Sequence, residues 1–142
     1  MAKVEQSIII KAPVEKVFSY LCDPMNQLEW LPSMTDVRDI TGEGVGQKFG
    51  WTYKMMGVSF KGETEVVESV GSERRVIKST GGIQSTWTWT TKSENGNTLV
   101  NLTVEYTIPV PVLGKVAERM VLRQNEREAA LAMTNIKERL ES

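Results

Sequence analysis

Residues 4–11 predict a first strand, because they are rich in β-branched residues and place Val4, Ile8 and Ile10, with Gln6, on one side. Apolar and polar residues alternate from residue 34 to about residue 108, in segments separated by turn-forming residues such as Asn95 and Gly96. The predicted strands are residues 34–41, 47–55, 58–69, 73–80, 84–92 and 98–108. Because short turns join consecutive segments, we expect an antiparallel meander.

Helical periodicity replaces the alternation in three places. Pro13 suits the first position of a helix, and this helix should end at Asp23, because the residue before a proline leaves the helical region. Residues 25–31 predict a short second helix, whose apolar side would hold Met25, Leu28 and Leu31. Residues 112–140 predict a third helix roughly 40 Å long. This order predicts one α+β domain over residues 1–142, with two short helices after the first strand.

The alternation also separates two faces of the predicted sheet. One face is rich in aromatic residues and Met, whereas the opposite positions are mostly Thr, Ser, Lys and Glu. We therefore expect a six- to seven-stranded sheet whose polar face is exposed to solvent. Its apolar face would curl around the terminal helix. The apolar stripe of that helix is interrupted by Gln124, Asn125 and Glu128. Buried polar groups need partners, so the middle of the helix faces either solvent or a partly polar, hydrated cavity.

The composition removes much enzyme chemistry, because the 142 residues include no histidine and one cysteine, Cys22. Histidine-based catalytic triads and histidine-assisted metal sites are excluded, and we expect no metal and no cofactor. Seventeen Lys and Arg against eighteen Asp and Glu argue against nucleic acid as a partner. The lone cysteine and the lack of a long apolar run predict a cytoplasmic protein without stable membrane insertion.

Both ends of the chain resemble a known family. The segment IKAPVEKVFSYL at residues 10–21, with DPMN at 23–26 and WLP at 30–32, resembles the opening of the START-like, helix-grip superfamily (SRPBCC). Residues 111–119 and 135–140 resemble the terminal helix of its polyketide cyclase/dehydrase and lipid transport group. The resemblance implies a curved antiparallel sheet around a long C-terminal helix, with a deep apolar cavity between them. Members bind lipids, sterols, polyketide intermediates or quinones there, and some are enzymes.

On this fold, the aromatic face would form the wall of the cavity, the terminal helix its roof, and the short helices one end. We therefore predict a site for a small hydrophobic ligand such as a lipid, quinone or polyketide. The expected wall is Trp51, Tyr53, Met55, Phe60, Trp87, Trp89 and Tyr106; the roof is Met120, Gln124, Glu128 and Leu131; and Trp30 and Met34 lie near the short helices. The alternative for each of these residues is that it simply fills the core.

Two other functions stay open at this point. A cyclase, aromatase or dehydratase could use Tyr53, Tyr106 or Glu128 as proton donors or acceptors. Against this, Glu128 could form a surface ion pair with Arg123 or Arg127, and the missing histidine favours binding over catalysis. A protein-interaction module of the co-chaperone type would need an exposed apolar patch. The sequence leaves the ligand and the oligomeric state open.

Overall fold

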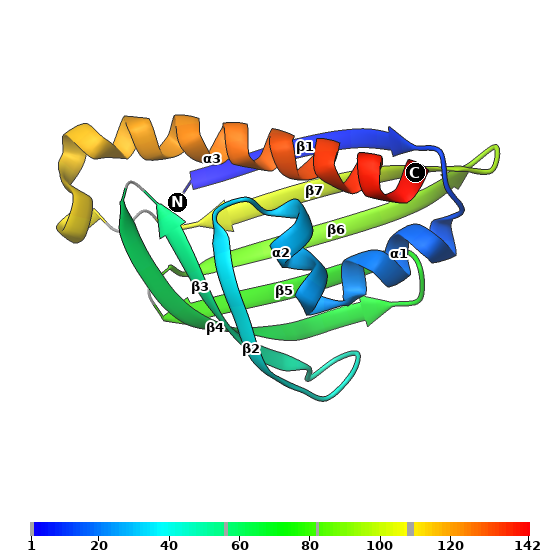
Figure 1. The fold of residues 1–142 in the computed structure, drawn as a ribbon, viewed down its shortest axis with the longest axis horizontal. Helices are drawn as coiled ribbons and strands as arrows, with labels where there is room; N and C mark the ends of the chain where they lie inside the picture. Colours follow the sequence, from blue (N-terminus) through cyan, green and yellow to red (C-terminus); the bar gives the residue numbers. More distant parts are fainter. Residues whose placement is uncertain (1, 56, 82, 108–109) are drawn as a thin grey trace.

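Seven strands form one fully antiparallel sheet, with helices on its concave side (Figure 1). The computed structural model describes residues 2–55, 57–81, 83–107 and 110–142, without the side chains of residues 110–118 and 121. The strands are β1 (Ala2–Ile10), β2 (Met34–Thr41), β3 (Lys48–Met55), β4 (Val58–Val70), β5 (Arg74–Gly81), β6 (Ser85–Glu94) and β7 (Asn97–Tyr106). Their order in the sheet is β1-β7-β6-β5-β4-β3-β2, so the meander runs from β2 to β7 and β1 closes the far edge.

The helices lie where the sequence predicted them. They are α1 (Val14–Cys22), the 3-10 turn η1 (Pro24–Asn26), α2 (Gln27–Trp30) and α3 (Val110–Glu141). In Figure 1, α3 runs beside β1 along the length of the sheet, while α1 and α2 lie over the middle strands. The α+β class, the two short helices after β1 and the long terminal helix are thus confirmed.

Local sequence explains the turns and the curvature of the sheet. Asn95 and Gly96 both have positive φ angles, 53° and 84°, as a two-residue hairpin turn between β6 and β7 requires. The register shifts in β2, and again between Val66 and Glu68 in β4. Such bulges bend a strand and increase its twist, so they help the sheet to curl around the helices.

The C-terminal end of α3 is fastened to the corner between β1 and α1. Lys137 Nζ donates a hydrogen bond to the carbonyl oxygen of Ile9 at 2.9 Å. The backbone N–H of Lys11 donates to Glu141 Oε2 at 2.8 Å, and this bond, together with Lys137, lowers the pKa of Glu141. Ile136 and Leu140 bury their side chains on the same end of the helix. These contacts fix how α3 lies on the sheet.

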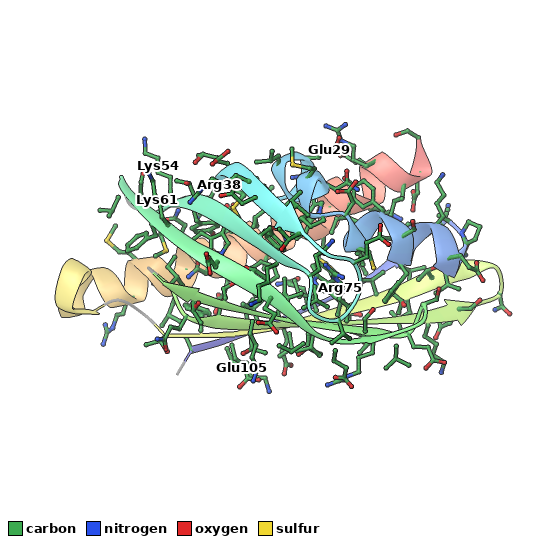
Figure 2. The ribbon with its side chains drawn as sticks, turned by 90° about the horizontal axis from the view of Figure 1, so that it is seen from below. Glu29, Arg38, Lys54, Lys61, Arg75 and Glu105 are labelled. Atoms are coloured by element: carbon green, nitrogen blue, oxygen red, sulfur yellow. The ribbon has the colours of Figure 1, made fainter. Side chains whose placement is uncertain are left out.

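The two faces of the sheet differ as the alternation predicted. On β7, Val100, Leu102 and Val104 are buried, whereas Glu105 projects from the side of the sheet opposite to the helices (Figure 2). The short second helix departs from its prediction, because Met25 and Leu28 are exposed and the buried residues are Leu31, Gln27 and Trp30. The segment begins as a 3-10 turn and contains only one α-helical turn, so a continuous 3.6-residue period gives the wrong buried side.

Candidate functional site

A cavity lies between the concave face of the sheet and the helices. It has an open volume of about 90 Å³ and is partly open to solvent. Engineered apolar cavities that bind benzene are larger, roughly 150 Å³, so this space holds at most one aromatic ring unless its walls shift. Its lining residues are Val4, Gln27, Trp30, Leu31, Met34, Trp51, Tyr53, Met55, Thr64, Ile77, Ser79, Ile83, Ser85, Trp87, Val104, Tyr106, Asn125, Glu128 and Ala129.

Cross-strand register creates this space by aligning small hydroxyl residues on neighbouring strands. Thr64 pairs with Ser79, Ser79 with Ser85, and Ser85 with Tyr106, so these residues form one row across the concave face. Thr64 Oγ1 and Ser79 Oγ lie 2.6 Å apart and share a hydrogen bond. The sequence did not predict this row, because alternation assigns a residue to a face but does not say which residues on other strands lie beside it.

Three tryptophans fix the helical end of the cavity. Trp30 on α2 packs edge-on against Trp89, with ring centroids 5.5 Å apart and an interplanar angle of 83°. The ring centroids of Trp30 and Trp87 lie 6.2 Å apart. Tilted and edge-to-face aromatic pairs of this kind are favourable. Trp87 lines the cavity, whereas Trp89 is buried outside its lining, so Trp30 docks α2 on β6 and leaves one indole facing the open space.

The position of Trp51 depends on a glycine on the neighbouring strand. A Cβ atom at Gly62 would lie 2.4 Å from Trp51 Cζ2 and 2.2 Å from the carbonyl oxygen of Thr80. Only glycine therefore allows the indole to approach β4 this closely. Gly62 is a positioning residue for one wall of the cavity.

Three buried hydrogen-bond donors around the cavity have no partner among the residues that the structure describes. They are Trp30 Nε1, Trp51 Nε1 and the Tyr106 hydroxyl. Burial raises the pKa of Tyr106; the Asn125 amide opposes this shift without reaching good hydrogen-bond geometry. Buried polar groups are nearly always paired with protein, water or ligand. Three side chains that line one cavity thus carry unpaired donors, each of which would gain a partner from an acceptor atom that reached it.

Glu128 brings a carboxylate to the same cavity. Its Oε1 accepts a hydrogen bond from the backbone N–H of Ser33 at 2.6 Å, and the residue is only 8% exposed. The alternative of a surface ion pair with Arg123 or Arg127 is wrong, since the carboxylate is buried whereas both arginines are exposed. Burial raises the pKa of the Tyr53 phenol, and the Glu128 carboxylate raises it further. Tyr53 is therefore a neutral hydroxyl beside an acid.

The roof of the cavity differs from its prediction. Met120 and Leu131 are 56% and 45% exposed and do not line the cavity. The described residues of α3 that are buried are instead Glu128, Ala129, Ala132, Met133, Ile136 and Leu140. They follow one another at intervals of one, three or four positions and so share one side of the helix, and Leu131 is not on that side. Of the two alternatives for the middle of the helix, the cavity-facing one is correct for Asn125 and Glu128.

Other predicted residues lie near the cavity without lining it. Phe60 is buried in the core, and Gln124 is half-buried outside the lining. The structure does bring Trp30, Met34, Trp51, Tyr53, Met55, Trp87, Tyr106 and Glu128 together around one space. The apolar positions Leu113, Val116, Ala117 and Val121 of the predicted helix lie outside the described side chains.

A second buried charged residue, Arg75 on β5, does not line the cavity. Its guanidinium donates a hydrogen bond of 3.4 Å to Oε1 of Gln47, which lies in the loop between β2 and β3 (Figure 2). Burial lowers the pKa of Arg75 and raises that of the neighbouring free thiol, Cys22. Within the described part of the chain, no cluster of His, Cys, Asp or Glu could hold a metal ion. No helix there is long and apolar enough to cross a membrane.

Comparison with protein families adds to this geometry. The model of the family described as polyketide cyclase / dehydrase and lipid transport matches residues 1–141. The chain belongs to this family. A comparison with curated proteins finds no match. The family match over residues 1–141 confirms the predicted resemblance, whose motifs lie at the two ends of the sequence.

Solved structures share the fold of this family member at low sequence identity. TTHA0849 from Thermus thermophilus superposes with a TM-score of 0.85 and 22% identity, over 98% of this chain and 97% of that one. The Zhui aromatase/cyclase from Streptomyces sp. R1128 gives 0.81 and 16%, over 99% and 93%. The Aha1 dimer from Colwellia psychrerythraea gives 0.67 and 19%, over 99% and 97%. At these identities the likeness concerns the fold.

Proposed function

We propose that this family member binds a small, largely apolar molecule in the cavity between its sheet and helices. The observation that carries the proposal is the set of three unpartnered donors, Trp30 Nε1, Trp51 Nε1 and the Tyr106 hydroxyl, around one apolar space. A ligand with a hydrophobic body and one or more acceptor oxygens would pair these donors and bury its rings against the aromatic wall.

The size of the cavity favours a compact ring compound over an extended chain. At about 90 Å³ it holds roughly one ring, and a longer molecule would extend through the opening. Among the ligand classes that the sequence suggested, a quinone-like compound therefore fits better than a long lipid. The predicted cytoplasmic location stays a prediction.

A matched pair of ligands tests the proposal. Naphthoquinone carries carbonyl acceptors that naphthalene lacks, and in both compounds the second ring would extend through the opening of the cavity. Binding of either should change the fluorescence of Trp30 and Trp87. We expect naphthoquinone to bind more tightly, and Tyr106→Phe to weaken naphthoquinone without affecting naphthalene. Tyr20→Phe is the control, because the Tyr20 hydroxyl bonds Glu29 away from the cavity. The proposal fails if neither compound changes the fluorescence or the melting temperature, or if Tyr20→Phe and Tyr106→Phe act alike.

A catalytic role is a second candidate, because a neutral Tyr53 hydroxyl and the Glu128 carboxylate line the same cavity. Such a pair can donate and accept protons on a bound carbonyl compound. Tyr53→Phe and Glu128→Gln should then abolish turnover of a carbonyl substrate while ligand binding persists. Unchanged turnover in both variants would leave binding as the function.

A further inference from the structure

The charge inside the cavity is carried by one residue. Among the residues that line the cavity, Glu128 carries the acidic side chain. Its carboxylate accepts a hydrogen bond from the backbone N–H of Ser33, which is a neutral donor. Unlike Glu68, Glu65 and Glu141, which form ion pairs at the surface, Glu128 forms none with the side chains that the structure describes. A buried carboxylate without a cation is costly, because the attraction to a counter-charge is what offsets its lost hydration.

The described basic side chains lie elsewhere. Arg123 and Arg127, one turn or less from Glu128 along α3, are exposed. Arg75 is buried beneath the loop between β2 and β3, where it contacts Gln47 (Figure 2). Arg38, Lys54 and Lys61 lie on β2, β3 and β4, respectively, in the same view, and none of them lines the cavity. Within the described side chains, the protein therefore supplies no cation to Glu128.

The walls around Glu128 suit a cation as well. Trp30, Trp51, Trp87 and Tyr53 line the same space, and the faces of such rings attract ammonium groups, most strongly when water is excluded. The opposite charge is disfavoured, since a carboxylate or phosphate placed here would meet Glu128 without any described Lys or Arg to offset the repulsion. The electrostatics of the cavity thus select the sign of the ligand's charge.

We propose that the molecule bound in this cavity is an amphipathic amine: its protonated nitrogen pairs with the Glu128 carboxylate, and its ring lies between the tryptophans. This inference rests on the proposed binding function and names the class of ligand. It excludes fatty acids and phospholipids whose charged head group would enter the cavity.

Three compounds of nearly equal shape test the sign of the charge. They are para-methoxyphenethylamine, para-methoxyphenethyl alcohol and para-methoxyphenylacetate, whose shared ether oxygen provides the acceptor that the unpartnered donors require. Isothermal calorimetry or ligand-observed NMR at neutral pH should rank amine over alcohol over carboxylate, with about a tenfold preference for the amine over the alcohol. Glu128→Gln should remove this preference while the alcohol binds as before.

Glu126→Gln is the matched control, since it removes the same charge from an exposed position two residues away. It should leave the ranking of the three compounds unchanged. The amine inference is wrong if the unsubstituted protein binds the alcohol and the amine equally, or if it binds the carboxylate best. The binding function stands in either case. If none of the three binds while naphthoquinone does, the amine inference alone is wrong; if naphthoquinone and naphthalene also fail to bind, both are wrong.

Discussion

The Glu128 carboxylate and the Ser33 backbone N–H form a hydrogen bond of 2.6 Å that joins α3 to the loop between α2 and β2. The two residues are 95 positions apart, so this bond connects the roof of the cavity to its helical end. It gives Glu128 a structural role that is separable from its charge.

This separation predicts different effects for two substitutions. Glu128→Gln keeps an acceptor for the Ser33 N–H and removes a buried charge, so the free energy of unfolding should stay level or rise. Glu128→Ala leaves the N–H without its partner and should be less stable than the Gln variant by about 1–3 kcal/mol. Urea unfolding measures the difference, and hydrogen exchange at Ser33 should accelerate in the Ala variant alone. Equal stabilities would show that the bond contributes nothing.

A second prediction concerns Gly62. Gly62→Ala places a methyl group against Trp51 and the Thr80 carbonyl oxygen, so it should lower the free energy of unfolding by about 1–3 kcal/mol and displace the indole from the cavity wall. Gly71→Ala is the control, because nothing lies within 4 Å of its added Cβ atom. Thermal melts and ligand binding measure both. Similar results for the two variants would contradict the close approach of Trp51 to β4.

Two buried hydroxyl groups should respond in opposite ways to deletion. The Thr98 hydroxyl donates to the carbonyl oxygen of Ala12 at 2.7 Å in a fully buried site, so Thr98→Val should cost about 1–3 kcal/mol. The Tyr106 hydroxyl has no described partner, so Tyr106→Phe should leave stability unchanged or raise it by up to about 1 kcal/mol. Denaturant unfolding of the two ligand-free variants measures the change in the free energy of unfolding that each substitution causes. A large loss in Tyr106→Phe would mean that this hydroxyl is paired.

All three tyrosines should ionise at a higher pH in the folded protein than in the unfolded chain. Burial raises the pKa of Tyr20, Tyr53 and Tyr106, with a further rise from Glu29 at Tyr20 and from Glu128 at Tyr53. Because the raised pKa belongs to the folded state, stability is complete below the unfolded value of about 10 and declines as the pH rises above it. Tyrosinate absorbance should therefore appear together with unfolding, and Tyr53→Phe should make the alkaline loss of stability less steep. Tyrosines that ionise at about pH 10 in the folded protein would contradict this.

The order of elements and the two faces of the sheet followed from the sequence alone. Strand alternation and helix periodicity are properties of neighbouring residues, so they placed all seven strands, and the aromatic face that holds Trp51 and Trp87, without knowledge of the fold. The absence of histidine likewise removed imidazole chemistry at once. Polar residues in the middle of α3 pointed to the cavity, although the same pattern also fitted a solvated helix.

Only the tertiary structure decided which residues meet. The sequence predicted Leu131 in the roof and left Glu128 either in the roof or in a surface ion pair. The packing of α3 on the sheet buries Glu128 and leaves Leu131 45% exposed. The hydroxyl row from Thr64 to Tyr106, the gap at Gly62 and the unpartnered donors all depend on register between strands distant in sequence. A local pattern fixes the direction of each side chain relative to its own strand or helix. The packing of those elements against one another determines what that side chain touches.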